Sequence, residues 1–384
     1  MGKLIKIIIV IALFTLLLIV ISDYDSIYAK IKNKSLFTGE AVKNISDGAA
    51  GQRQPKAMEI PEEAGKESIV LFCPRDNCLG NLVYLINNSK KIGCAVFDLD
   101  IPELADLLKE KDARVFIDDS NYPEGGIEEK RNKENLDLRF TKQDNSGNLM
   151  HNKFCIFDNS IVMTGSFNPT SNDNEKNNNN MIVLFSKYLA ENYEDELDEL
   201  WKRTPENSKE NSKNNQPARY PKIMLNGNLV ENYFCPEDRC AEHIINILGQ
   251  ANESIKFMAF SFTHDGIGSK IAEMHGKGIM VKGVFEKKQN TNQYSEYFRL
   301  KNISTGINAE RMDVLYDGNK YNMHHKVFII DDKIVITGSF NPTANGDKGN
   351  DENILIIHNK GLAEEYIKEF DTIYGEAKKV EMLK

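Results

Sequence analysis

The sequence predicts an α/β protein with two domains, each built on a central sheet flanked by helices. Three observations support this prediction: the length, the alternation of strand-like and helix-like segments, and an internal duplication. At roughly 100–200 residues per domain, 384 residues allow two domains. The apolar content of 41% and charged content of 27% are ordinary for a globular chain with its own core. The net charge of −9 argues against a general nucleic-acid-coating protein, although a local basic cleft remains compatible with it.

The N-terminal segment predicts a membrane helix. Lys3 and Lys6 precede an uncharged run over residues 7–21 that is apolar except for Thr15. This run is slightly shorter than a comfortable membrane span and long for the core of a signal peptide. Because no small-x-small cleavage site follows, we expect residues 1–22 to be an uncleaved signal-anchor, with a cleaved signal peptide as the alternative. The two lysines favour a membrane-anchored or secreted protein with an extracytoplasmic body, although the lysines of segment 30–34 oppose this orientation.

An internal repeat divides the rest of the chain. Residues 150–172 and 323–345 are identical at 15 of 23 positions, at a constant offset of 173. The sequences FCPRDNC and FCPEDRC form a second matched pair, at an offset of 162. A period this long indicates a domain duplication with a pseudo-twofold relation. We therefore expect a stalk at 23–66, a first domain at 67–203, a polar linker at 204–220 and a second domain at 221–384.

Each half carries the same order of elements. After the Cys pair we expect a helix, a strand, a second helix and a second strand, which is typical of an α/β sheet domain. The repeated motif then reads as two strands joined by a tight turn, followed by an amphipathic helix. The first four elements are expected at 79–88, 94–99, 104–108 and 114–117, and at 241–251, 255–262, 267–274 and 280–285. The paired strands are expected at 153–157 and 161–164, and at 326–330 and 333–337.

The repeated motif is His-x-Lys-x4-Asp-x6-Gly-Ser-x-Asn. A His and a Lys two positions apart on a strand point to the same face, so an imidazole and an ammonium meet one ligand group. The Gly-Ser-x-Asn end of the next strand adds a hydroxyl and an amide, and this set suits a phosphate. Two such histidines permit a two-step displacement, with one as nucleophile and one as acid. The candidate residues are His151, Lys153, Asp158, Ser166 and Asn168, and His324, Lys326, Asp331, Ser339 and Asn341.

A residue that is repeated in both copies of the motif need not take part in the chemistry. We expect the serines and asparagines to bind the phosphate. Asp158 and Asp331 are candidate catalytic residues, but an aspartate at a strand–turn junction more often caps the turn. His325 lies between His324 and Lys326, so it should point to the opposite face and take part in packing.

These residues resemble the phospholipase D superfamily, and the match extends over most of residues 67–378. The resemblance implies two fused α/β domains, a phosphohistidine intermediate, and neither catalytic metal nor cofactor. It also implies that His151 is the nucleophile and His324 the acid, although the reverse assignment stays open. Family motifs are often followed by a Glu that orients a catalytic His; here Glu352 follows the second motif and Asn179 the first. A carboxylate raises the basicity of an imidazole that it touches, so the two histidines should differ.

The six cysteines allow three interpretations. Cys73 and Cys78 form one local pair and Cys235 and Cys240 another, while the remaining two fall in apolar runs. The even count and paired spacing favour disulfides in an oxidising compartment. Six reduced thiols are the second interpretation. A zinc site at the two local pairs is the third, weakened by the four-residue spacer and the lack of a nearby His.

The sequence leaves the substrate open within the class of phosphodiesters. The Gly-Ser-Phe-Asn ends of both motifs resemble the compact nuclease-type members of the family more than its lipid synthases, and this resemblance implies an endonuclease acting on DNA or RNA. A phospholipase D or phosphatidyl transferase is the alternative, favoured by the expected membrane helix and by the acidic net charge. A non-catalytic, membrane-tethered phosphate-binding protein is the third hypothesis. Because both motifs lie in one chain, no oligomer is required.

Overall fold

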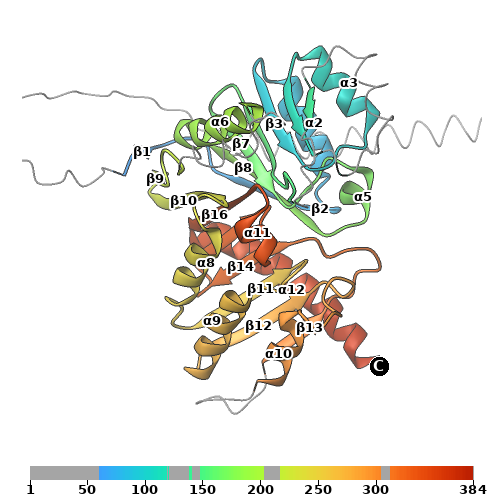
Figure 1. Cartoon of the computed structure of the whole chain (residues 1–384), viewed down its shortest axis with the longest axis vertical. Helices are drawn as coiled ribbons and strands as arrows, with labels where there is room; N and C mark the ends of the chain where they lie inside the picture. The colour runs from blue at the N-terminus through green and yellow to red at the C-terminus, as the bar shows by residue number, and fades with distance from the viewer. Residues whose placement is uncertain are drawn as a thin grey trace, which may run out of the picture. The chain divides into compact units, whose positions relative to one another are not determined.

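The computed structural model describes residues 60–118, 120, 138–140 (backbone only), 148–202, 217–303 and 312–383 (Figure 1). The predicted membrane helix at 1–22 lies outside these ranges, as do most of the predicted stalk and linker. Within the described ranges, no helix is both long and apolar enough to cross a bilayer. Met58–Lys384 forms one compact unit, and the predicted boundary between two domains inside it stays a prediction.

The first half contains a seven-stranded mixed sheet in the order β2-β8-β7-β6-β3-β4-β5. Helices lie between its strands along the chain, as the sequence predicts. The strands are β2 (Ile69–Cys73), β3 (Ile92–Val96), β4 (Arg114–Ile117), β5 (Leu138–Phe140), β6 (Lys153–Phe157), β7 (Ile161–Gly165) and β8 (Asn179–Phe185). The helices are α2 (Cys78–Asn87), α3 (Pro102–Glu110), α5 (Ser171–Glu175) and α6 (Lys187–Lys202).

The second sheet repeats this order and extends it with β9 and with β1, a strand from the start of the described chain. Its nine strands follow the order β1-β9-β10-β16-β15-β14-β11-β12-β13, so the last seven reproduce the first sheet strand by strand. The strands are β1 (Glu62–Glu63), β9 (Lys222–Leu225), β10 (Asn228–Cys235), β11 (Ser254–Ala259), β12 (Met280–Phe285), β13 (Asp313–Tyr316), β14 (Lys326–Ile330), β15 (Ile334–Gly338) and β16 (Glu352–His358). The helices are α8 (Cys240–Leu248), α9 (Asp265–Gly276), α10 (Glu296–Asn302), α11 (Ala344–Lys348) and α12 (Lys360–Met382).

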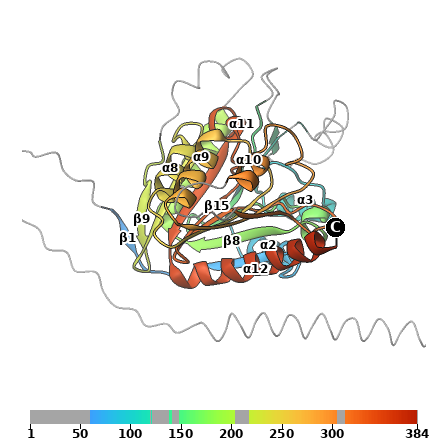
Figure 2. The same cartoon turned by 90° about the horizontal axis from the view of Figure 1, so that it is seen from below.

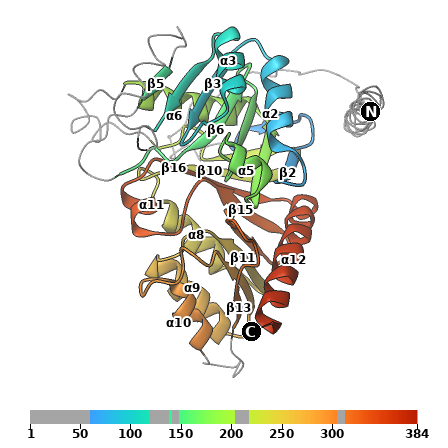
Figure 3. The same ribbon diagram turned by 90° about the vertical axis from the view of Figure 1, so that its right-hand side faces the viewer.

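Three hydrophobic clusters hold these layers together. Helices α6 and α12 pack with one face of each sheet in a single cluster that runs through both halves. The opposite face of the second sheet packs on α8, α9 and α10, and Figure 3 shows these helices across the sheet from α12. The opposite face of the first sheet packs on α2 and α3. Figure 2 shows α12 on the opposite side of the strands from α8 and α9. Because α12 also contacts β2 of the first sheet, the core is shared between the halves.

The two motif hairpins close in tight two-residue turns. Asp158 and Asn159 have φ values of 49° and 53°, and Asp331 and Asp332 have 51° and 54°. Positive φ at both central positions defines the type I′ turn, in which Asp and Asn are tolerated. The turn follows the whole length of β6 or β14, about 17 Å of strand from the lysine that begins it.

Short reciprocal bridges join the two halves next to the motifs. Met150 pairs with Asp351, and Asn178 pairs with Met323, both in parallel bridges. Adding the 173-residue offset to Met150 and Asn178 gives Met323 and Asp351, so each bridge is the twofold equivalent of the other. Each motif histidine is therefore placed against the start of the strand that follows the other motif.

Candidate active site

His151 is oriented by a carboxylate from the other half of the chain. Its Nδ1 lies 2.9 Å from both carboxylate oxygens of Glu352, the first residue of β16. The His151 amide also donates to the Asp351 carbonyl at 2.9 Å, and this bond holds the start of β16 next to His151. Glu352 is fully buried. With Nδ1–H donated to the carboxylate, Nε2 of His151 carries the lone pair.

His324 occupies the twofold-related position but has a neutral partner. Its Nδ1 lies 2.8 Å from Oδ1 of Asn179, the first residue of β8. The nearest carboxylate is Asp173, whose Oδ2 is 3.7 Å from the same nitrogen. The sequence left open which histidine Glu352 would serve. The structure places it on His151, so the carboxylate acts across the junction and not within its own half.

The two motif lysines complete the polar centre. Lys153 Nζ donates to the His151 carbonyl at 2.7 Å, and Lys326 Nζ donates to the His324 carbonyl at 2.8 Å. Each ammonium also lies about 5 Å over an aromatic ring, that of Phe97 for Lys153 and Phe260 for Lys326. The same rings touch the histidines edge-on, with Phe97–His151 and Phe260–His324 centroids 4.8 and 4.6 Å apart.

Burial dominates the ionisation of this centre. It lowers the pKa of His151 to about 4 against the opposing charge of Glu352, and Lys153 and Lys326 lower it further. The pKa of His324 lies well below its usual range, because burial and the two lysine charges disfavour the cation. Burial likewise lowers the pKa of Lys153 to about 8 and that of Lys326 well below its usual range. Carboxylates, chiefly Glu352 and Asp173, offset only part of the effect of burial on the two lysines, so a bound phosphate anion would stabilise their charged forms.

The predicted serine ligands have structural roles. Ser166 Oγ and Ser339 Oγ accept the backbone N–H of Asn180 and of Asn353, respectively, at 3.0 Å, and both serines are fully buried. The glycine before each serine is needed here. A Cβ on Gly165 would lie 2.3 Å from the Asn180 carbonyl, and its φ is 136°. The hydroxyls thus pin β8 and β16 in place, and direct phosphate binding by them is not supported by their contacts.

The first motif asparagine adjoins the site through Asp173. Asn168 donates its Nδ2 and backbone N–H to Asp173 Oδ2, each at 2.8 Å. The Oδ1 atoms of Asn168 and Asn341 are buried without a hydrogen-bond partner within the described residues. A free amide oxygen accepts a hydrogen bond, so these two atoms suit a donor such as water, whereas a phosphate oxygen would need the Nδ2 group of the same amide.

The structure does not bring Asp158 and Asp331 to this centre. Asp158 Oδ1 accepts the backbone N–H of Lys90 and of Lys91, and Asp331 Oδ1 accepts those of Glu253 and Ser254. Both carboxylates therefore tie the hairpin turn to the preceding loop. Each aspartate lies a full strand length from the motif lysine that begins β6 or β14. A catalytic role for Asp158 and Asp331 is therefore not supported.

His325 has partners beyond packing. It is fully buried, with Nε2 2.9 Å from Glu369 Oε1 and Nδ1 3.3 Å from Asn180 Oδ1. Arg75, from the loop after β2, forms an ion pair with the same Glu369. In the first half the matching position is Asn152, which donates to Glu196 at 2.9 Å. The expectation that this side chain points away from the site is in line with these contacts.

This histidine predicts acid sensitivity. Burial lowers the pKa of His325 to about 3, below the value of about 6.5 in an unfolded chain. Between these values the unfolded state binds the extra proton, so the unfolding free energy falls as pH falls, by up to about 1.4 kcal/mol per pH unit. His325→Asn, which copies Asn152, should flatten the dependence of Tm on pH between 6 and 4. An unchanged slope in the variant would show that His325 does not titrate on unfolding.

All six cysteines are paired. Disulfides join Cys73 to Cys78 and Cys235 to Cys240, the two local pairs, and a third joins Cys94 to Cys155 across β3 and β6. These bonds leave no thiolates for the zinc interpretation. The first two disulfides adjoin the site, because Cys73 pairs with Asn179 and Cys235 pairs with Glu352 across neighbouring strands.

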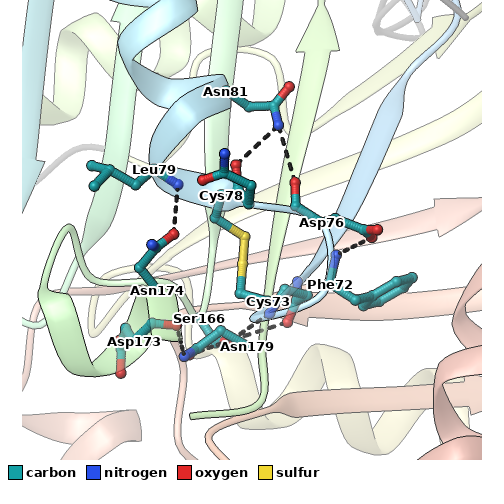
Figure 4. Close-up of a disulfide and its surroundings, with 12 residues drawn as sticks. Phe72, Cys73, Asp76, Cys78, Leu79, Asn81, Ser166, Asp173, Asn174 and Asn179 are labelled. Atoms are coloured by element: carbon teal, nitrogen blue, oxygen red, sulfur yellow. Dashed lines mark hydrogen bonds between the residues drawn. A yellow bond between two sulfur atoms is a disulfide. The ribbon is translucent and has the colours of Figure 1, made fainter. Parts of the chain in front are cut away.

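Figure 4 shows the first of these disulfides beside the α5 segment. Cys78 begins α2, and the next amide, that of Leu79, donates to Asn174 Oδ1 at 3.0 Å. The second half repeats this contact, with the Ala241 amide donating to Asp347 Oδ1 at 2.9 Å. Each disulfide thus anchors both the strand paired with a histidine partner and the short helix beside the motif asparagine.

We expect the disulfide that contributes least to thermal stability to contribute most to activity. A chain-entropy estimate gives about 2 kcal/mol for the five-residue separation of Cys235 and Cys240, and about 4 kcal/mol for the 61-residue separation of Cys94 and Cys155. Cys235→Ala/Cys240→Ala should therefore lower Tm less than Cys94→Ala/Cys155→Ala but reduce kcat/KM more. Thermal melts and rates on the two variants check this, and parallel losses of Tm and activity would contradict it.

Sequence reasoning missed three side chains of the centre. Asp173 lies in the asparagine-rich segment after the first motif. The matched position in the second half is Gly346, so the two halves differ in charge here, and this difference could have drawn attention to Asp173. Phe97 and Phe260 end the strand segments before the motifs. Their matched positions one residue beyond β3 and β11 were a second signal that the repeat offered.

Comparisons with known proteins agree with this geometry. Residues 85–201 and 244–374 match the family described as cardiolipin synthase, PLD-like domain. The chain belongs to the phospholipase D superfamily. It is 30% identical to a phospholipase D of Rickettsia conorii over 153 residues, which are 40% of this chain and 73% of that relative. It is 24% identical to a mitochondrial cardiolipin hydrolase of Xenopus tropicalis over 165 residues, 42% of this chain and 71% of the relative.

A solved structure extends the likeness to most of the described unit. The phosphatidylserine synthase of Haemophilus influenzae superposes with a TM-score of 0.63 at 15% identity, covering 79% of this chain and 85% of that one. At this identity the likeness shows the fold alone. The family match and the named relatives together identify this chain as a phosphodiesterase.

Proposed function

We propose that this enzyme is a metal-independent endonuclease that acts through a phosphohistidine on His151. The observation that carries the proposal is the contact of His151 Nδ1 with both oxygens of the buried Glu352. It leaves Nε2 as the basic atom that faces the substrate. It also provides a negative charge for the cation that forms when Nε2 becomes phosphorylated.

The reaction then proceeds in two displacements. The charge of the bound phosphate anion opposes the burial that lowers the pKa of His324 and favours its protonated form. The Nε2 lone pair of His151 attacks phosphorus, the bond from phosphorus to the leaving oxygen breaks, and protonated His324 gives that oxygen its proton. Water next attacks the phosphohistidine while His324 takes up a water proton, and the phosphorus–nitrogen bond breaks to restore His151. Lys153, Lys326 and the motif amides hold the equatorial oxygens in both steps.

The surroundings of the motifs support a nucleic acid as substrate. Within the described residues the exposed large apolar side chains are scattered over several elements, among them Ile69, Tyr84, Met280 and Phe298. An enzyme that works on a lipid surface usually presents a contiguous apolar patch. Next to the second motif the exposed large side chain is Tyr321, an aromatic residue flanked by lysines, which suits a nucleotide chain better than acyl groups.

A phospholipid is the second candidate substrate. The names of the relatives favour it, since they include phospholipase D and cardiolipin hydrolase. The third hypothesis, a non-catalytic phosphate-binding protein, is opposed by the intact pair of histidines and by the buried carboxylate on His151. Each hypothesis makes a different prediction for the same experiment.

The full-length protein is incubated with excess EDTA and single-stranded DNA, duplex DNA, RNA or anionic liposomes, in parallel with His151→Ala. Cleavage of a nucleic acid that the variant lacks supports the proposal. Release of a lipid headgroup instead replaces it with the phospholipase hypothesis. Turnover of none of the four substrates favours the non-catalytic hypothesis, as would biological activity preserved in both His151→Ala and His324→Ala.

The lysines predict an alkaline limit of activity. Because burial lowers the pKa of Lys153 to about 8, its ammonium is present below that pH and lost above it. An anionic substrate should therefore bind less well as pH rises through about 8, and kcat/KM should fall. Bound phosphate restores the charge balance, so the limit in kcat should lie at higher pH. Rates measured from pH 6 to 10 check this; coincident limits in both parameters would contradict it.

We further propose that the catalytic body lies outside the cytoplasm, held by the N-terminal segment. The three disulfides support this placement, because structural disulfides persist in oxidising compartments. A reporter that is active only in the cytoplasm, fused after Lys384, should be inactive. Full activity of that reporter would place the body inside the cell.

A further inference from the structure

The segment just before the second motif is held across the two halves. We call residues 319–322 the Tyr321 loop. Asn319 Nδ2 donates to the Lys176 carbonyl at 3.1 Å, and the Asn322 amide donates to Asn177 Oδ1 at 3.2 Å. The His324 amide, two residues farther on, donates to the Asn178 carbonyl at 2.8 Å. These bonds fix the loop relative to the catalytic centre, and three residues cover at most about 11 Å.

The Tyr321 side chain presents an aromatic face among cations. It is 42% exposed. Lys176 Nζ lies 5.6 Å from the ring centroid and Lys320 Nζ lies 5.9 Å from it. Lys288 Nζ donates to the Tyr321 carbonyl at 2.9 Å, but the carboxylates of Asp317 and Glu286 offset its charge, so the positive charge beside the ring is that of Lys176 and Lys320. The loop thus joins an exposed ring to a local excess of positive charge on an acidic protein.

The duplication provides a built-in comparison for this loop. At the 173-residue offset, Asn148 matches Tyr321 and Gly349 matches Lys176. A Cβ on Gly349 would lie 2.4 Å from Asn148 Oδ1, so these two residues pack closely together. One rim of the site therefore carries an aromatic–cation pair, while the matched rim carries an amide and a glycine. Fold alone does not explain the difference, because both loops hold the same backbone bridge to the other half.

The rim that carries Tyr321 adjoins His324. In the proposed reaction His324 protonates the leaving oxygen, so groups on the leaving side of the scissile bond pass this rim. We propose that Tyr321 is a stacking platform for the nucleobase on the leaving-group side, with Lys176 and Lys320 facing the adjoining phosphate. This inference rests on the proposed endonuclease function and adds the direction in which a single strand crosses the site.

The chemistry of the rim favours a nucleotide over a lipid. A nucleobase offers a π face to the tyrosine ring, and its phosphates lie within reach of the lysines on either side. Every base has such a face, so the platform predicts tolerance of base identity. A base paired in a duplex is stacked on its neighbours already, so the platform also predicts a preference for single strands.

The test compares matched substitutions on the two rims of the full-length enzyme. Tyr321→Asn installs the residue of the matched rim, Tyr321→Phe keeps the ring, and Asn148→Ala is the control. Each is assayed in EDTA with a short fluorescent single-stranded oligonucleotide and with bis(p-nitrophenyl) phosphate, a diester without a nucleobase. Tyr321→Asn should raise the KM for the oligonucleotide about tenfold, and its effect on the small diester should be several-fold smaller. Tyr321→Phe and Asn148→Ala should each stay within about twofold of the wild type on the oligonucleotide.

The outcomes separate this inference from the proposed function. If wild type cleaves the oligonucleotide and Tyr321→Asn behaves like Asn148→Ala, the platform is wrong and the endonuclease proposal stands. If wild type cleaves only the small diester or lipid, both fail together. If Tyr321→Asn weakens binding to anionic phosphatidylglycerol vesicles and leaves oligonucleotide cleavage unchanged, the loop contacts a membrane and the inference is overturned. Equal loss on the oligonucleotide and the small diester would indicate damage to the centre and would also contradict it.

Discussion

Replacing His151 with alanine is expected to lower kcat/KM by about 10⁴-fold and to abolish the covalent phosphoenzyme. The reason is that Nε2 of His151 is the only imidazole nitrogen in the described site backed by a hydrogen-bonded carboxylate, Glu352. Its matched residue gives the control. In His324→Ala the nucleophile remains but the leaving oxygen receives no proton.

The two variants should differ most with an activated substrate. A p-nitrophenyl leaving group needs no acid, so His324→Ala should release nitrophenol in a burst and accumulate phosphate on His151. The labelled protein is quenched with denaturant at alkaline pH, because a phosphohistidine hydrolyses in acid. It is then digested, and the modified peptide is identified by mass spectrometry. Label on His324 in the His151→Ala variant would reverse the assignment. Label on neither histidine, with activity retained, would rule out the covalent route.

The polar centre was largely predictable because the duplication exposes it. A His and a Lys two positions apart must share one face of a strand, and two copies at a fixed offset imply two such faces. The structure indeed places His151, Lys153, His324 and Lys326 in one buried centre, where their charges act on each other's pKa values. The order of strands in both sheets follows the same repeated pattern.

The pairing across the halves was not predictable from the chain. Sequence distance links Glu352 to the second motif, whereas the parallel bridge of Met150 with Asp351 carries it to His151. Similarly, Ser166 was assigned to the phosphate because a hydroxyl can bind one, but the close approach of β8 at Gly165 uses it to hold Asn180. The partner of Glu352 and the role of Ser166 both depend on which strand ends lie next to each other in the folded chain. A local sequence pattern does not contain that information.

Glu352→Gln is expected to lower kcat/KM by about 10²- to 10³-fold, the second-largest effect. Glutamine can still accept the Nδ1–H of His151, so the tautomer with a free Nε2 survives. What disappears is the negative charge that stabilises the imidazolium of the phosphohistidine. The loss should therefore appear in kcat and in a lower steady-state level of phosphoenzyme, with KM changed much less.

Asn179→Glu is the matched variant, because it gives His324 the partner that His151 has. Its carboxylate would raise the pKa of His324 from its depressed value, and so keep the acid protonated to higher pH. We expect activity within about tenfold of wild type and a pH profile shifted upward, with the phosphate still on His151. Combining Asn179→Glu with Glu352→Gln then asks which feature selects the nucleophile. Transfer of the phosphate to His324 would mean that the carboxylate alone decides, whereas retention on His151 would assign the choice to the asymmetric rims that orient the substrate.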